Sequence, residues 1–139
     1  MNILKVFTRA RKVGNVGEAE AARLLRKKKY KILERNYVAL GNEIDIIAEN
    51  RDYTVFVEVK TRSYDVGGNK WEVRPAASVT YEKQTAIIKV AKCYLSYNKH
   101  TKNKKQVRFD IIEVYTDKDM KVKNTVHIEN AFRQERRYF

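Results

Sequence analysis

Acidic side chains interrupt two stretches of the chain that otherwise have the composition of buried β-strands. The segment EIDIIAENRDYTVFVEVK, residues 43–60, alternates around a polar turn and is rich in β-branched residues, which is typical of a β-hairpin. If the turn is symmetric about residues 51 and 52, Asp45 lies opposite Glu58, with Cβ atoms about 4.5–5.5 Å apart. Two like charges in this position destabilise a hairpin, and burying either one without a partner costs more.

A divalent cation resolves this conflict. Mg²⁺ takes one or two protein carboxylates as ligands and keeps its other positions for water and phosphate oxygen. Lys60 shares a strand face with Glu58, where an ammonium can orient a water molecule and balance the charge of a phosphate. The pattern of Asp45 followed by Glu58-x-Lys60 therefore predicts a site for phosphodiester hydrolysis. The alternative is a surface salt bridge among these three residues, with Glu43 as the partner of Lys60.

Other chemistries find few suitable residues in this sequence. Cys93 is the only cysteine, and His100 and His127 are the only histidines, so a zinc cage of thiolate or imidazole ligands is excluded. No convincing Ser/His/Asp or Cys/His set and no Gly-rich phosphate loop is present. A bound metal would have to be held by carboxylate oxygen, which favours Mg²⁺ or Mn²⁺ as the cofactor.

A length of 139 residues predicts a single domain over residues 1–139, with its core at about 14–132, the range of the family resemblance given below, and hydrophobic periodicity predicts that it is α/β. We expect a helix over about 17–29, a strand over 31–39, the hairpin, a helix from Thr80, a strand over 107–115 and a short last strand or extended tail over 124–132. This order, αβββαββ, predicts a mixed central sheet flanked by helices, either one on each face or both near one face. Glu18 lies on the inward stripe of the first helix with Ala22 and Leu25; the alternative is that it only complements the helix dipole.

Charge points to a polyanionic partner. Thirty Lys and Arg residues against seventeen Asp and Glu give a formal charge of +13, which favours nucleic acid. A membrane surface competes, but the basic residues are dispersed and no apolar run approaches the roughly 20 residues of a spanning helix. The opening MNILKVFTRARK has too short an apolar core for a signal peptide, so we expect a cytoplasmic protein. A solvated basic surface with no partner is the remaining alternative.

Several blocks of the sequence resemble one family of small bacterial proteins. GEAEAARLL is followed in order by ILERNY, EIDIIA, VFVEVKTRS, AKCYL, RFDIIEV and HIENAF, between about residues 14 and 132. The chain is similar in these blocks to the YraN-like family, which has the restriction-endonuclease-like fold of the PD-(D/E)xK superfamily and resembles archaeal Holliday-junction resolvases. The resemblance implies Asp45, Glu58 and Lys60 as the core motif, Glu18 as an additional helix acid, and Lys83 as an auxiliary residue facing phosphate.

The favoured hypothesis is a metal-dependent endonuclease, acting on DNA in preference to RNA and on branched DNA if the resolvase similarity extends to substrate. Asp45, Glu58, Glu18 and the Val59 carbonyl would hold the metal, and Lys60 would position water. The predicted phosphate contacts are Arg62, Lys70, Arg74 and Lys83, with the irregular segment 63–79 closing over the strand. A nucleic-acid-binding module that does not cut and a subunit that docks on an acidic protein are the alternatives. The resolvase-like relatives act as dimers, so a homodimer also stays open.

Overall fold

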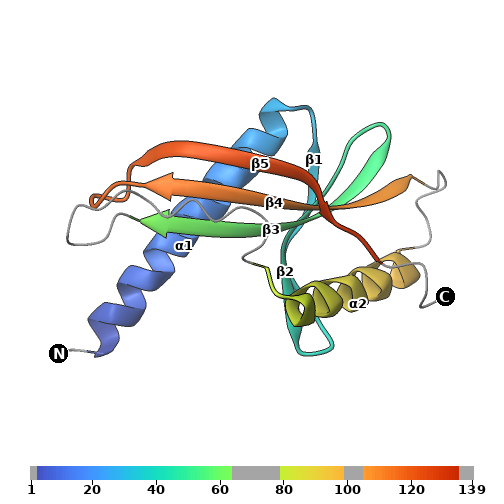
Figure 1. The fold of residues 1–139 in the computed structure, drawn as a ribbon, viewed down its shortest axis with the longest axis horizontal. Helices are drawn as coiled ribbons and strands as arrows, with labels where there is room; N and C mark the ends of the chain where they lie inside the picture. The colour runs from blue at the N-terminus through green and yellow to red at the C-terminus, as the bar shows by residue number, and fades with distance from the viewer. Residues whose placement is uncertain (1–2, 64–78, 99–104, 135–139) are drawn as a thin grey trace.

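The helices and strands follow one another in the order that the sequence predicts. The computed structural model of the chain describes residues 3–63, 79–98 and 105–134 (Figure 1). Its elements are α1 (Ile3–Lys27), β1 (Lys31–Ala39), β2 (Asn42–Glu49), β3 (Tyr53–Ser63), α2 (Tyr81–Tyr97), β4 (Gln106–Thr116) and β5 (Val122–Phe132). Neither α1 nor α2 is long and apolar enough to cross a membrane.

The described strands form one mixed sheet in the order β1-β2-β3-β4-β5 (Figure 1). Neighbouring strands are antiparallel except β3 and β4, which are parallel. Parallel neighbours need a long crossover connection, and α2 lies in the connection between these two strands. The α/β fold class with a mixed central sheet is thereby confirmed, and the arrangement is compatible with the restriction-endonuclease-like fold.

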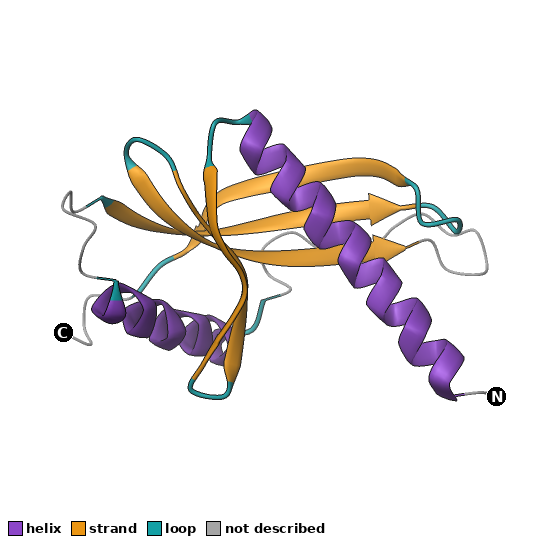
Figure 2. Ribbon diagram, turned by 180° about the vertical axis from the view of Figure 1, so that it is seen from behind, coloured by secondary structure: helices purple, strands orange, loops and turns teal. Residues whose placement is uncertain are grey.

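The helices cover opposite faces of the sheet, so the core has two layers. Figure 2 shows α1 crossing one face, and α2 lies on the other. Alternation along each strand supplies both layers, because successive side chains point to opposite faces. The layer under α2 includes Ile47, Phe56, Ile87, Val90 and Ile111. The layer under α1 includes Ala21, Leu25, Val55, Val57 and Ile112.

The β2–β3 hairpin has the predicted register. Ile46 pairs with Val57, and Glu49 pairs with Thr54, so the hairpin is symmetric about residues 51 and 52. Asn50 closes the turn, because its side-chain oxygen accepts hydrogen bonds from the backbone N–H groups of Asp52 (2.9 Å) and Tyr53 (2.8 Å). A turn closed by an Asn side chain in this way fixes the register of both strands.

Helix α1 begins at Ile3, so the prediction that this helix starts near Gly17 is wrong. Gly14 and Gly17 suggested a boundary, yet both lie inside the helix. Gly17 has a packing role instead: a Cβ atom at this position would lie 1.8 Å from Thr61 Oγ1 of β3. The glycine therefore lets α1 approach β3 closely, and the next residue, Glu18, lies beside Asp45 and Glu43 of β2.

The remaining elements agree with the sequence except in the length of the last strand. The Thr80 hydroxyl caps α2 by accepting a hydrogen bond from the Lys83 backbone N–H at 3.1 Å, as predicted. At the other end of the chain, β5 extends over eleven residues and pairs with β4 from Val122 to Phe132. Its sequence alternates weakly because several of its residues are exposed, which is why only a short strand or tail was expected.

Candidate active site

Asp45 lies where β2 separates from β3. The backbone pairing of the two strands ends at Ile46 and Val57, and beyond it Asp45 Oδ2 accepts a hydrogen bond from the Val59 backbone N–H at 2.8 Å. Ile44 and Ile46 are two positions apart, yet they pack in different core layers. Strand β2 therefore twists sharply at Asp45, and the carboxylate is held in the fork between the strands.

Three carboxylates converge at this fork. Oxygen atoms of Glu18 from α1 and of Glu43 and Asp45 from β2 all lie within 4.8 Å of one another. Asn36 of β1 supports two of them: with its amide nitrogen turned toward the acids, it donates to Glu43 Oε1 at 2.9 Å and to Glu18 Oε1 at 3.1 Å. The Asn36 backbone has a φ of +53°, a left-handed conformation that Asn adopts more readily than most residues. Three elements, α1, β1 and β2, thus build one acidic cluster.

Glu58 lies beside this cluster and is paired with two ammonium groups. Its Oε1 atom is 3.6 Å from Lys60 Nζ and 3.9 Å from Lys83 Nζ. The Glu58 side chain is only 8 % exposed, and Oε2 has no hydrogen-bond partner among the described residues. A buried carboxylate oxygen without a partner is costly, so the structure leaves one acceptor position here to be satisfied by another group.

The electrostatics of the acids show how closely they interact. Burial, followed by the negative charge of Glu58, raises the pKa of Asp45 to about 7. The Val59 N–H and the Lys83 ammonium oppose this shift but do not cancel it. Burial and the charge of Asp45 likewise raise the pKa of Glu18 above its ordinary value. The site therefore concentrates negative charge that a proton or a cation would relieve.

The structure brings most of the predicted site residues together, but not all of them. Glu18, Asp45, Glu58, Lys60 and Lys83 come together from α1, β2, β3 and α2. Arg62 lies further along β3, half-buried, where it pairs in register with Tyr115 of β4. Val59 contributes its N–H to Asp45. Lys70 and Arg74, with most of the 63–79 segment, lie outside the described residues.

Two residues of the site were missed in the sequence. Glu43 was considered only as a salt-bridge partner of Lys60, although its position two residues before Asp45 on the same strand face already placed it near the site. Asn36 gave a weaker signal, since Asn is depleted in strands and lies here in the middle of β1. Its contact with acids on two other elements depends on the twist of the sheet, which a sequence pattern does not report.

Comparison with known proteins assigns the chain to a family. The profile described as "Uncharacterised protein family UPF0102" matches residues 17–114. The chain belongs to this family. It is the YraN-like family that the sequence resembles, and the UPF0102 match includes all of the acids described above.

Individual UPF0102 proteins are similar over nearly their whole length. One from Caldanaerobacter subterraneus is 43% identical over 121 residues, covering 86% of this chain and 93% of that protein. One from Alkaliphilus oremlandii is 42% identical over 123 residues, covering 88% of this chain and 98% of that protein. A third, from Clostridium acetobutylicum, is 40% identical over 122 residues, covering 88% and 94%. Family membership therefore applies to the chain as a whole.

Proposed function

We propose that this UPF0102 protein is a metal-dependent endonuclease that hydrolyses phosphodiester bonds of nucleic acid. One observation carries the proposal: carboxylates of Glu18, Glu43 and Asp45 converge at a strand fork beside Glu58, whose buried Oε2 has no partner among the described residues. Arg35 pairs with Glu18 at 3.7 Å, and Lys60 and Lys83 pair with Glu58. Asp45, however, has no ion pair among the described residues, and its raised pKa is typical of a functional site. The two lysines next to Glu58 supply the positive charge that a phosphate group would require.

The donor atoms fit a hard divalent cation. All four acids offer carboxylate oxygen, the ligand type that Mg²⁺ and Mn²⁺ prefer. In this proposal Asp45 and Glu58 hold the ion with Glu18 and Glu43, and the Val59 carbonyl remains the predicted backbone ligand. When bound, such an ion polarises a phosphoryl oxygen and lowers the pKa of a coordinated water.

The lysines have separate roles in the proposal. Lys60, at 3.6 Å from Glu58 Oε1, holds the attacking water and favours its deprotonation. Lys83 reaches the same carboxylate from α2 at 3.9 Å and is 39% exposed, so it can contact a phosphate oxygen of the substrate. Arg62 would contact the next phosphate along β3. Lys70 and Arg74 remain predicted phosphate contacts.

The proposed substrate is DNA, held mainly through its phosphates. The formal charge of +13 supports a polyanion as the partner. Contacts of this kind carry affinity without sequence preference, so affinity should fall steeply as salt is raised, by about tenfold or more between 50 and 200 mM for several phosphate contacts. Salt-insensitive binding would contradict this part of the proposal.

A cleavage assay tests the proposal. The purified protein is incubated with single-stranded, duplex, flap and four-way-junction DNA and with structured RNA, in Mg²⁺, Mn²⁺ or EDTA. We expect metal-dependent cutting that falls by at least about 100-fold in Glu58→Gln and Lys60→Ala. Asp119→Asn, which removes an exposed acid in the β4–β5 turn, is the matched control and should cut normally. Binding without cutting under any of these conditions would favour the non-catalytic module.

A further inference from the structure

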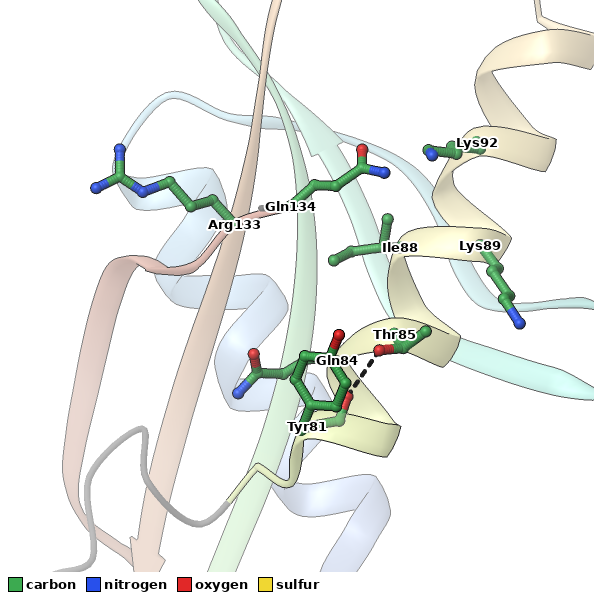
Figure 3. A pocket seen from close by; sticks show the side chains of 8 residues that line it. All are labelled: Tyr81, Gln84, Thr85, Ile88, Lys89, Lys92, Arg133 and Gln134. Atoms are coloured by element: carbon green, nitrogen blue, oxygen red, sulfur yellow. Dashed lines mark hydrogen bonds between the residues drawn. The ribbon is translucent and has the colours of Figure 1, made fainter. Parts of the chain in front are cut away.

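A groove separate from the acidic cluster runs along α2. It lies between this helix and the residues that follow β5, and Figure 3 shows Ile88 and Lys92 extending from α2 toward Gln134, which extends back toward them. A second hollow shares Ile88, Lys92, Arg133 and Gln134 with the first and continues to Leu95 and Val107. The two hollows therefore form one continuous groove.

Helix α2 presents different sides to the groove and to the candidate active site. Tyr81, Thr85, Ile88 and Lys92 recur at the four- and three-residue spacing of one helical face, and all four line the groove. Lys83 instead reaches Glu58. The first turn of α2 thus contributes Tyr81 to the groove and Lys83 to the candidate active site.

The lining combines an apolar floor with a basic rim. The floor consists of Ile88, Ala91, Leu95, Val107 and Phe109. Around it are the Lys92 ammonium and the amides of Gln84 and Gln134. Lys89 lines the outer edge, and in Figure 3 its ammonium points away from Gln134, as the Arg133 guanidinium points away from α2. None of the described residues that line these two hollows is acidic, although Glu82 lines a neighbouring hollow that shares Tyr81, Thr85 and Lys89 with the first. This composition suits a ligand whose negatively charged groups lie at the rim of the groove and whose flat apolar groups lie on its floor.

We propose that this groove binds single-stranded DNA adjoining the cleavage site, an inference that rests on the proposed function. Lys92, with Lys89 at the outer edge, would contact phosphates, and Tyr81, a residue that is 56% exposed, offers a ring on which a base can stack. Single-strand binding proteins combine basic grooves with exposed aromatic rings in this way. The apolar floor favours DNA over RNA, because a ribose 2′-hydroxyl buried against it would have no hydrogen-bond partner.

Affinity for tailed duplexes tests the inference. Fluorescence anisotropy in EDTA compares a blunt duplex with the same duplex carrying a single-stranded tail of about 10 nucleotides, within the usual site size, at either the 3′ or the 5′ end. We expect the tail to increase affinity about tenfold through stacking and phosphate contacts. The double variant Lys89→Glu/Lys92→Glu should abolish this gain, and Tyr81→Ala should reduce it about threefold to tenfold.

A matched charge reversal separates the groove from general electrostatics. Lys31→Glu/Lys121→Glu removes the same charge from exposed positions outside the groove, so it should weaken blunt and tailed duplexes equally and leave the tail gain intact. The inference is overturned if the groove variants retain the tail gain. It is also overturned if an RNA tail gives the same gain, or if an acidic, leucine-containing peptide binds the groove more tightly than DNA.

The outcomes for the groove and for the nuclease are distinguishable. Binding is measured in EDTA, so it does not depend on cutting. If the single-stranded tail gives no gain in affinity but metal-dependent cleavage is intact, the groove proposal is contradicted and the nuclease proposal is not. A tail effect that depends on Lys89 and Lys92, in a protein that cuts none of the substrates, would reject the nuclease proposal alone.

Discussion

At the residue scale, the charge of Asp45 lowers the stability of the folded protein although the proposed function needs it. Its pKa is raised to about 7 by burial and by Glu58, whereas an unfolded Asp titrates near 4. A raised pKa means that the folded state binds the proton more tightly than the unfolded state. The stabilising contribution of the protonated group is therefore fully present below about pH 4 and is lost as the pH rises through 7.

Asp45→Asn should consequently stabilise the metal-free protein. The amide keeps an oxygen that can accept from the Val59 N–H but removes the charge, so we expect a gain of roughly 1–2 kcal/mol at pH 8 after allowing for solvent screening. Urea unfolding in EDTA at pH 5 and pH 8 measures it, and the gain should shrink at pH 5. A destabilised variant at pH 8 would show that the Asp45 charge is satisfied within the folded protein.

At the element scale, the close approach of α1 to β3 determines whether Glu18 reaches the cluster. Gly17→Ala should destabilise the protein by roughly 2–3 kcal/mol, since its Cβ would lie 1.8 Å from Thr61 Oγ1. Gly14→Ala is the matched control in the same helix, because a Cβ there meets nothing within 4 Å. It should stabilise α1 by about 0.5–1 kcal/mol. Thermal unfolding compares the two variants, and equal effects would contradict the packing role of Gly17.

The elements themselves were largely predictable from local pattern. Alternation in β2 and β3 and the turn ENRD determine the hairpin register, and the bounds of β1 agree with the sequence. The start of α1 was not predictable, because a glycine at a helix boundary and a glycine that allows a strand to pack closely look alike in sequence.

The acidic cluster was predictable only in part. Asp45, Glu58 and Lys60 follow from spacing, but the contact of Asn36 with Glu18 and Glu43 depends on how α1 and β1 pack around the twisted fork.

At the scale of the whole molecule, a second buried network ties distant elements together. Asp110 of β4 accepts from Arg108 Nε and Nη2, both at 2.8 Å, and lies 2.7 Å from His127 Nε2 of β5. Lys28, just after α1, lies 2.8 Å from His127 Nδ1. An ammonium can only donate, so Nδ1 accepts and Nε2–H donates to Asp110. The network therefore connects the end of α1 with both β4 and β5.

Asp110→Asn should destabilise the whole domain, and in a pH-dependent way. Burial alone would raise the pKa of Asp110, but hydrogen bonds from His127 and Arg108 outweigh it and lower the pKa below its ordinary value. The stability that this carboxylate contributes is present above its unfolded pKa, near 4, and is lost as the pH falls through the folded value. We expect a loss of roughly 3 kcal/mol at pH 7. Urea unfolding should show a smaller difference from wild type at pH 3, with Asp119→Asn unchanged at both.

Cation binding by the acidic cluster is the central claim, and it can be measured without any substrate. Titration with Mn²⁺, followed by the electron paramagnetic resonance signal of the free ion, gives the number of sites and their affinity. The account predicts a Mn²⁺ site that Mg²⁺ displaces, weakened by at least about tenfold in Asp45→Asn and in Glu43→Gln and unchanged in Asp119→Asn. Mn²⁺ binding of equal strength in all four proteins, or none in any, would contradict it.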